Sequence, residues 1–297
     1  MIRLAHHLAL TACLSIALAG SARAQTLVSR ESTLNYNYVY GAGGDSHTGN
    51  NTVPDTTLLA SDTEQTGDSG ATSGTLPGDP PRPYSAGVSC DLEHEYAVAG
   101  PLTSFRSITA TGSTLVTAAS SGFGTAQMIA ANPGNSLTLY FNLSAPIYYS
   151  LNGVITLDEA GFASGVALQR FDGIVWAQVF NSIFLPGGQG AFSSSGTLNP
   201  GQYRISSSIA LDAFGNENKT GTYNYTLRTF IRADMNCDGK VDGLDIQAFA
   251  DALLDPIAYA ADYPTCNPLN GDFNNDNSVT TADVAPFTQC VLTGGCP

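Results

Sequence analysis

The chain has 297 residues, of which only 12% are charged, and its formal net charge is −14. This length fits one large and one small domain. So acidic a chain repels nucleic acid and anionic membranes and attracts cations. Few charges together with 31 Gly and 13 Tyr favour an extracellular β-protein over a helical cytosolic enzyme.

Residues 1–24 have the features of a secretory signal peptide. Arg3 gives a positive start, Leu8 to Leu18 form a short apolar run, and Ala22-Arg23-Ala24 is an A-x-A cleavage site. The apolar run is too short to span a bilayer, so no transmembrane segment is predicted. Cleavage after Ala24 predicts a secreted or cell-surface protein.

Residues 25–232 predict an antiparallel β-sandwich, jelly-roll-like, of roughly ten short strands. The breaks between the strands carry turn residues, at Asn132-Pro133-Gly134, Asn152-Gly153, Asp172-Gly173 and Pro200-Gly201. Runs that alternate apolar and polar residues without helical periodicity are 136–142, 153–157, 166–171, 174–180, 203–211 and 223–230. Residues 41–86 are rich in Gly, Ser, Thr, Asp, Asn and Pro, and this composition predicts a long polar loop.

Three segments of this domain resemble β-sandwich domains of exported bacterial proteins, many of which carry a PEP-CTERM sorting tail. They are the strand Leu137–Leu143, the turn Leu198–Tyr203 and the closing strand Gly221–Leu227. The resemblance covers about residues 100–230. It implies the fold and export, because that group has no agreed activity.

The composition changes at the start of a C-terminal segment. Residues 234–297 hold ten Asp, one Lys and no Arg or Glu. Within them the segment Asp234–Asp245 aligns with Asp272–Asp283 at an offset of 38 residues. The apolar residues that follow also match, because Ile246 aligns with Val284, Phe249 with Phe287, and Leu253-Leu254 with Val291-Leu292. Such spacing marks one face of a helix after each loop.

Each repeat has the spacing of a calcium loop. Calcium takes about six to eight oxygen ligands, which a loop of about 12 residues supplies from positions 1, 3, 5, 7, 9 and 12. Loop one would use Asp234, Asn236, Asp238, the Lys240 carbonyl, Asp242 and Asp245. Loop two would use Asp272, Asn274, Asp276, the Ser278 carbonyl, Thr280 and Asp283. Position 6 needs a left-handed residue, and it is Gly239 in loop one and Asn277 in loop two. We expect two calcium ions, and tighter binding by loop one because it has four carboxylates against three.

Tandem loop–helix repeats with Asp at position 12 resemble type I dockerins, over residues 233–294. The resemblance implies a small all-α calcium-binding domain at 233–297 with a linking helix over Ala258–Pro264. It also implies a cohesin-like or other cell-surface partner in a polysaccharide context. In dockerins, loop positions 10 and 11 usually carry pairs of small or hydroxylic residues that are similar in the two repeats. Here the pairs differ: they are Gly243-Leu244 in loop one and Thr281-Ala282 in loop two. Cohesin recognition and symmetric two-way binding therefore do not follow. Pro286 should delay or kink the second helix.

The cysteines suit an exported protein. Cys13 lies in the signal segment, where Leu10-Thr11-Ala12-Cys13 offers lipoprotein processing as an alternative. Disulfides Cys237–Cys266 and Cys290–Cys296 are expected, with Cys90 left unpaired, although spacing alone does not fix connectivity.

Candidate catalytic and sugar-binding residues are few. Asp91, Glu93 and Glu95 alternate along one predicted strand and share a face, with His94 on the other. They could form an acid–base group or a surface metal site, but a solvated sheet face is the favoured interpretation. Asp158-Glu159 reads as a turn, and Trp176 as a core residue rather than a sugar platform. The tyrosines that could stack on a sugar are Tyr148, Tyr149, Tyr223 and Tyr225, although aromatic residues are ordinary in strands.

The leading prediction is a secreted or cell-surface, non-catalytic protein with a calcium-binding attachment module, in a context of polysaccharide binding or degradation. No catalytic residue is assigned. One alternative is a polysaccharide-acting hydrolase or lyase that uses the Asp91–Glu95 strand. Another is a purely structural surface protein.

Overall fold

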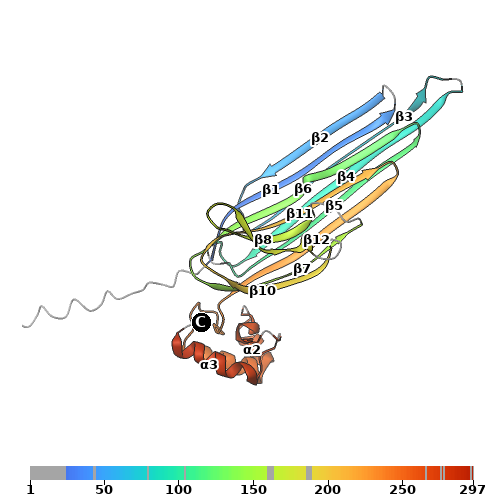
Figure 1. The fold of residues 1–297 in the computed structure, drawn as a ribbon. Coiled ribbons are helices and arrows are strands. Elements are labelled where there is room, and N and C mark those ends of the chain that lie inside the picture. Colours follow the sequence, from blue (N-terminus) through green and yellow to red (C-terminus); the bar gives the residue numbers. More distant parts are fainter. Residues whose placement is uncertain are drawn as a thin grey trace, which may run out of the picture.

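The computed structural model describes residues 25–296 except 43–44, 79, 104, 159–163, 185–188, 265, 275, 277 and 295. The expected signal peptide, residues 1–24, lies outside the described residues. The chain is mainly β: two antiparallel sheets pack as a sandwich, and a short C-terminal region with three helices follows. Figure 1 shows the helices at one end of the sandwich, beyond the end of β12.

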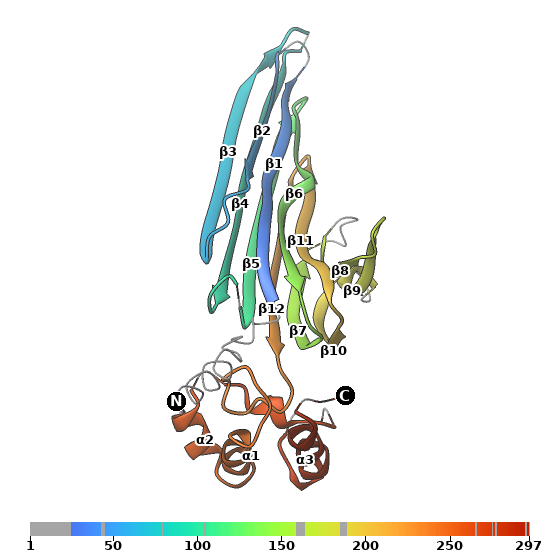
Figure 2. The same cartoon turned by 90° about the vertical axis from the view of Figure 1, so that its left-hand side faces the viewer.

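Each sheet has six strands. The first sheet has the order β2 (Asp45–Asp55), β1 (Gln25–Ala42), β6 (Thr125–Leu143), β11 (Gly201–Phe214), β8 (Gly165–Phe171) and β9 (Trp176–Asn181). The second has the order β10 (Gly190–Leu198), β7 (Ile147–Leu157), β12 (Glu217–Phe230), β5 (Ser107–Gly122), β4 (Arg82–Ala99) and β3 (Ser61–Leu76). Figure 2 shows the two layers edge-on, with β1 to β5 reaching away from the helices.

Alternating burial builds the core between the layers. Along β12, for example, Tyr223, Tyr225 and Leu227 point inward and are buried, while the residues between them face outward. At the end near the helices, Phe141 contacts Phe105 edge-on and Tyr203 face-to-face, each at 5.5 Å between ring centroids. Five of the six alternating runs predicted from the sequence fall within strands, and the sixth, 174–180, begins two residues before β9, so the predicted β-sandwich is confirmed.

The prediction of a long polar loop over residues 41–86 is wrong, because these residues form β2, β3 and the start of β4. β2 and β3 are edge strands, where an exposed outer face tolerates polar residues. Their inner side meets a ladder of stacked rings from β1, Tyr36, Tyr38 and Tyr40. A Cβ at Gly70 of β3 would lie 2.4 Å from the Tyr40 hydroxyl, so glycine permits this approach.

Two of the four predicted turns also lie inside strands. Asn132-Pro133-Gly134 falls in an irregular stretch of β6, where pairing with β1 jumps from Leu34↔Asn135 to Asn37↔Ile129. Gly153 is paired within β7, and a Cβ there would lie 2.4 Å from Phe192. Asp172-Gly173 and Pro200-Gly201 do separate strands as predicted. The described residues therefore hold twelve strands, several of them long.

The C-terminal region contains α1 (Asp245–Leu254), α2 (Pro256–Asp262) and α3 (Val284–Thr293). Short 3₁₀ helices are η1 (Ser182–Phe184), η3 (Pro268–Gly271) and η4 (Thr281–Asp283). α2 occupies the place of the expected linking helix, and the Asp255 side chain caps it by accepting from the Ala258 N–H at 3.1 Å. Pro286 neither delays nor breaks α3. It sits in the first turn, where its missing N–H would have no helical partner.

Both expected disulfides are present, Cys237–Cys266 and Cys290–Cys296, while Cys90 is free and buried in the sandwich. None of the helices within the described residues combines the length and apolar composition needed to cross a bilayer.

Candidate metal centres

Loop one is closed by its last carboxylate. Asp245 Oδ1 accepts the N–H groups of Met235 at 2.7 Å and Asn236 at 3.1 Å, and Oδ2 accepts the N–H of Asp242 at 2.9 Å. Position 12 thus ties positions 2, 3 and 9 together. The Asp245 side chain is fully buried. A carboxylate oxygen has more than one lone pair, so these bonds leave acceptor capacity directed into the loop.

Loop two repeats this arrangement atom for atom. Asp283 Oδ1 accepts the N–H groups of Phe273 at 2.7 Å and Asn274 at 3.3 Å, and Oδ2 accepts the N–H of Thr280 at 2.9 Å. Asn275 and Asn277, the latter being the expected position-6 residue, lie outside the described residues. Two loops of different sequence therefore close on the same hydrogen bonds.

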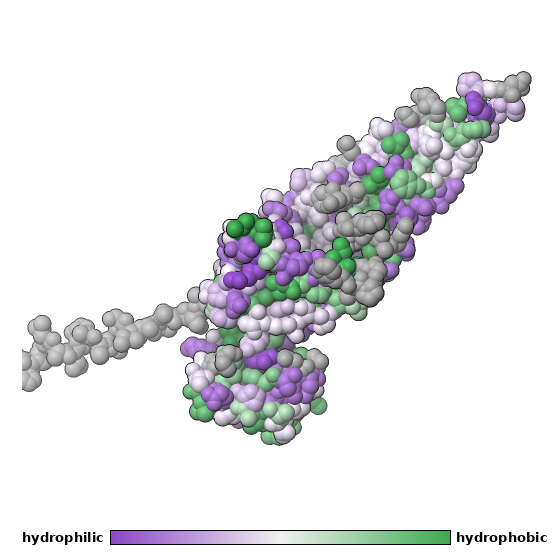
Figure 3. Space-filling model, viewed as in Figure 1, coloured by the Kyte–Doolittle hydropathy of each residue, from purple (hydrophilic) through white to green (hydrophobic). Residues whose placement is uncertain are grey.

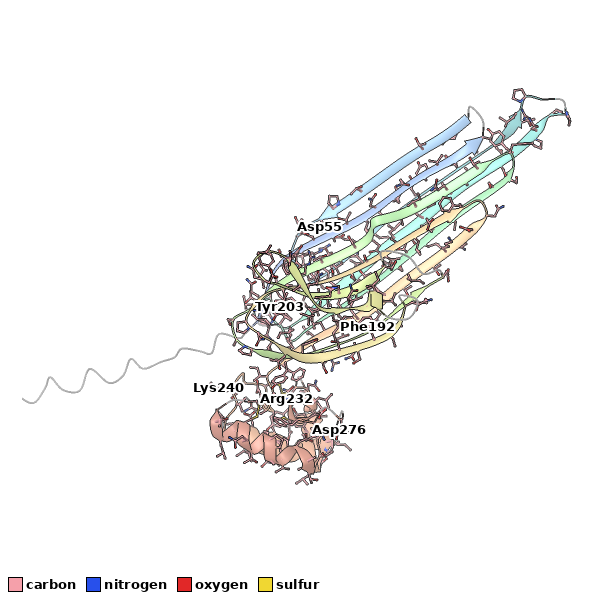
Figure 4. All side chains as sticks on the ribbon, in the orientation of Figure 1. Asp55, Phe192, Tyr203, Arg232, Lys240 and Asp276 are labelled. Atoms are coloured by element: carbon pink, nitrogen blue, oxygen red, sulfur yellow. A yellow bond between two sulfur atoms is a disulfide. The ribbon has the colours of Figure 1, made fainter. Side chains whose placement is uncertain are left out.

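Inside each loop the ligand side chains turn the backbone. Asn236 Oδ1 accepts the Asp238 N–H at 2.9 Å, and Asp238 Oδ1 accepts the Lys240 N–H at 2.9 Å. The equivalent bonds in loop two run from Asp276 to Asn274 at 3.0 Å and from Ser278 to Asp276 at 2.9 Å. Figure 4 shows Lys240 and Asp276 on opposite sides of the C-terminal region. These bonds shape the backbone of each loop, but among the described residues neither loop brings three carboxylate oxygens within 4.8 Å of one another.

Loop one holds a buried carboxylate oxygen without a hydrogen-bond partner. Asp234 is buried, and its Oδ1 has no hydrogen-bond partner, whereas Oδ2 accepts the Gly239 N–H at 3.0 Å. Burial, together with the charges of Asp245 and Asp238, raises the Asp234 pKa to about 7. Burial also raises the pKa of Asp245. Gly239 takes a φ of 88° at position 6. An oxygen-only donor set with an orphaned buried carboxylate oxygen fits a hard cation such as calcium.

A second acidic cluster lies in the sandwich and has a different character. Carboxylate oxygens of Asp55, Asp62 and Glu64 lie within 4.8 Å of one another. The buried guanidinium of Arg30 pairs with all three, at 2.6 Å to Asp62 and 3.4 Å to Asp55. His94 Nε2 lies 3.1 Å from Glu64. Arg30 already compensates these carboxylates, so they do not indicate a metal site.

Within this cluster the position of His94 decides its protonation. Its Nδ1 lies 3.0 Å from Asn135 Oδ1, and the Asn135 amide donates across the sandwich to the Glu93 and Ser113 carbonyls. Burial, aided by the Arg30 charge, lowers the His94 pKa to about 4. His94 is therefore neutral near pH 7.

The candidate acid–base residues do not form a site. Asp91 and Glu95 are exposed and Glu93 half-buried on the outer face of β4, with His94 inside, as the alternation predicted. Gln65 donates to Asp91 at 3.0 Å. Asp158 accepts the Thr220 N–H and hydroxyl, each at 2.7 Å, beside the end of β7, and Glu159 lies outside the described residues.

The aromatic candidates are distributed differently from the prediction. Trp176 is not a core residue: it is half-buried on edge strand β9, and contacts Arg204 at 4.6 Å and Tyr140 at 5.7 Å. β9 is the last strand of the first sheet, and none of its residues is fully buried. Of the four tyrosine candidates, Tyr149, Tyr223 and Tyr225 are buried in the sandwich. Arg232 covers one face of the Tyr148 ring, with its Cζ 4.3 Å from the ring centroid.

No protein-family model matches the chain, and no curated protein is significantly similar to it. Sequence reasoning missed Arg30, Asn135 and Arg232, because their partners are remote in sequence. The only signal for Arg232 was its place two residues before loop one.

Proposed function

We propose that residues 233–297 bind two calcium ions in a dockerin-like pair of loop–helix repeats. The observation that carries the proposal is the shared closure of the loops: Asp245 and Asp283 accept from the N–H groups of positions 2, 3 and 9 in both. The ligands would be the twelve residues expected from the sequence. The orphaned Asp234 Oδ1 supports loop one in particular.

Calcium would supply the countercharge that this region lacks. Its ten Asp are opposed by one Lys, and the core that holds the loops together is small. The chain's own contribution is a backbone pre-shaped by Gly239 and by the carboxylate–amide bonds. We expect the region to depend on the metal for much of its stability.

We propose further that this region attaches the protein to a partner. Apolar side chains at equivalent helix positions are exposed in both repeats: Ile246 and Val284 by 53% and 39%, and Leu254 and Leu292 by 80% and 78%. Apolar side chains left exposed at the same positions of both repeats are candidates for a protein-binding surface. Figure 3 shows hydrophobic residues on the C-terminal region away from the sandwich. A cohesin-like or other cell-surface protein is the proposed partner.

For the rest of the chain we propose a secreted or surface-exposed, non-catalytic β-sandwich of the jelly-roll-like kind, acting in polysaccharide binding or degradation. The alternation of β6, β7, β8, β10, β11 and β12 between the two sheets supports the jelly-roll comparison. The two disulfides are compatible with an extracellular location.

The calcium claim is tested by titration calorimetry and thermal unfolding of the mature chain. Two calcium sites are expected, and a chelator should lower the unfolding temperature of the helical region, followed by circular dichroism at 222 nm. Identical unfolding with calcium and with chelator would reject the proposal. Attachment is tested by a calcium-dependent pull-down, with Leu254→Ser as the variant that should lose the partner but keep both ions.

A further inference from the structure

Arg232 lies at the contact between the sandwich and the C-terminal region. Its Cζ is 4.3 Å from the ring centroid of Tyr148 on β7 and 5.3 Å from that of Phe273 in loop two. Its Nη1 also donates to the Phe273 carbonyl at 3.4 Å. Figure 4 shows Arg232 at the side of the C-terminal region that faces the sandwich. One guanidinium therefore joins a ring of the sandwich to a ring of a candidate calcium loop.

Phe273 links this contact directly to the loop's ligands. It is position 2 of loop two, and its N–H donates to Asp283 Oδ1 at 2.7 Å, while its carbonyl accepts from Arg232. The two ends of one residue thus hold the position-12 carboxylate and the guanidinium. A shift of the Asp283 carboxylate would therefore move Phe273, whose ring contacts the Arg232 guanidinium.

Loop one has no such link among the described contacts. Its position-2 residue, Met235, is fully buried in the C-terminal core, and its carbonyl accepts from the Tyr259 hydroxyl at 3.0 Å. The repeats match position by position in sequence, yet position 2 faces inward in one and toward the sandwich in the other. Loop one faces the sandwich across a cavity lined by Asp234, Gly239 and Arg228, whereas Phe273 of loop two is joined to Tyr148 through Arg232.

The sandwich side of the contact is firmly built. Tyr148 pairs with Phe230, the last residue of β12, and the two rings stack at 6.1 Å. In the C-terminal region, the Sγ of Cys296 lies 3.4 Å from the carbonyl oxygen of Arg232. Cys296 forms a disulfide with Cys290 of α3. The clamp thus connects β7 and β12 to both loop two and α3.

We propose that loop two is the docking surface by which the C-terminal region holds the sandwich of the same chain, with Arg232 as the clamp. Calcium in loop two then stabilises the sandwich as well as the helices, and calcium in loop one acts only within the C-terminal region. This inference rests on the proposed calcium binding. Arg232 is a positioning residue, because it ligates nothing itself.

The single tryptophan makes the test direct. Trp176 is the only one in the chain and lies on β9, so its fluorescence follows unfolding of the sandwich alone. In the full mature chain, saturating calcium should raise that unfolding temperature by about 2–4 °C, the shift expected when one or two cation–π contacts are secured. Arg232→Gln should lose most of the shift while titration calorimetry still finds two calcium ions. Arg228→Gln, which removes an exposed charge from β12 on the side that faces loop one, is the matched control and should keep it.

The outcomes separate the two proposals. A chain that binds no calcium rejects the proposed function. A chain that binds two ions but shows no calcium shift at Trp176, or an Arg232→Gln variant that keeps the full shift, overturns the clamp alone. Should Arg232→Gln fold poorly, Tyr148→Leu removes the sandwich ring instead and must also lose the shift. Asp283→Ala must lose it too.

Discussion

Phe249 of α1 and Phe287 of α3 stack face to face, with ring centroids 3.9 Å apart and planes within 7°. They are equivalent residues of the two repeats, 38 positions apart. Phe249 also lies against Gly271, where a Cβ would come within 3.1 Å of its ring. The helices that follow the loops therefore share one small core, and neither loop is held in place without the other repeat.

Phe249→Ala should accordingly disturb both calcium loops. Removing a buried ring from a core costs about 3–5 kcal/mol, and so small a core cannot collapse around the gap. In calcium, the helical signal at 222 nm should melt at a clearly lower temperature, and both calcium affinities should fall. Leu292→Ala is the control, because that side chain is 78% exposed and its loss should cost little. A variant with one weakened site and one intact site would show that the repeats are independent.

The two position-12 carboxylates should differ in importance. Loop one has four carboxylates and the buried, orphaned Asp234, whereas loop two has three carboxylates. Asp245→Ala should therefore remove more of the calcium-dependent stabilisation of the helical region than Asp283→Ala. Unfolding of each variant with calcium and with chelator measures this difference. The reverse order would mean that carboxylate number does not rank the two loops.

His94 should make the sandwich sensitive to mild acid. Its pKa is about 4 in the fold against 6.5 for the free side chain, so the unfolded chain takes up the proton first as the pH falls. The stabilisation is complete above about pH 6.5 and is lost as the pH falls toward 4, by about 3 kcal/mol in all. Denaturant unfolding followed by Trp176 in calcium measures it. His94→Gln should flatten this part of the profile.

Features set by neighbours in sequence could be predicted, and those set by remote strands could not. Each proposed calcium loop lies within twelve residues, so the repeat Asp234–Asp245 could be recognised from spacing alone, and in the fold Asp245 bonds to other residues of the same twelve. Residues 41–86 lack apolar alternation because β2 and β3 lie at sheet edges. Their tight contact, Gly70 against Tyr40, joins segments of opposite sheets.

The same reason explains the missed charged residues. Arg30 lies on β1 of the first sheet, and its partners Asp62 and Glu64 lie on β3 of the second. The sequence around Arg30, Asp62 or Glu64 does not predict that these residues form ion pairs. Inward-pointing charges on an edge strand also discourage that edge from pairing with other chains. The repeat in the C-terminal region is visible in the local sequence, whereas the pairing of charged residues across the sandwich is not.

Asp234 predicts opposite pH dependences for the metal-free and the calcium-bound C-terminal region. Its pKa is raised to about 7 in the fold, above its ordinary value of 3.8, by burial and by its acidic neighbours. Without metal, the stabilising proton is bound at low pH and lost as the pH rises through 7, so in chelator the helical region should be more stable at pH 5 than at pH 8. Calcium needs the deprotonated carboxylate, so calcium affinity should instead rise over the same range.

Thermal unfolding at 222 nm in chelator and calorimetric titration at each pH measure the two trends, and calorimetry in buffers of different ionisation enthalpy counts the proton released. Asp234→Asn should reduce the pH dependence in chelator, since the amide does not titrate, and should leave the part that comes from the raised pKa of Asp245. A calcium affinity that stays constant from pH 5.5 to pH 8 would show that Asp234 is already ionised in the metal-free protein. The unpartnered Asp234 oxygen would then not support a calcium ligand.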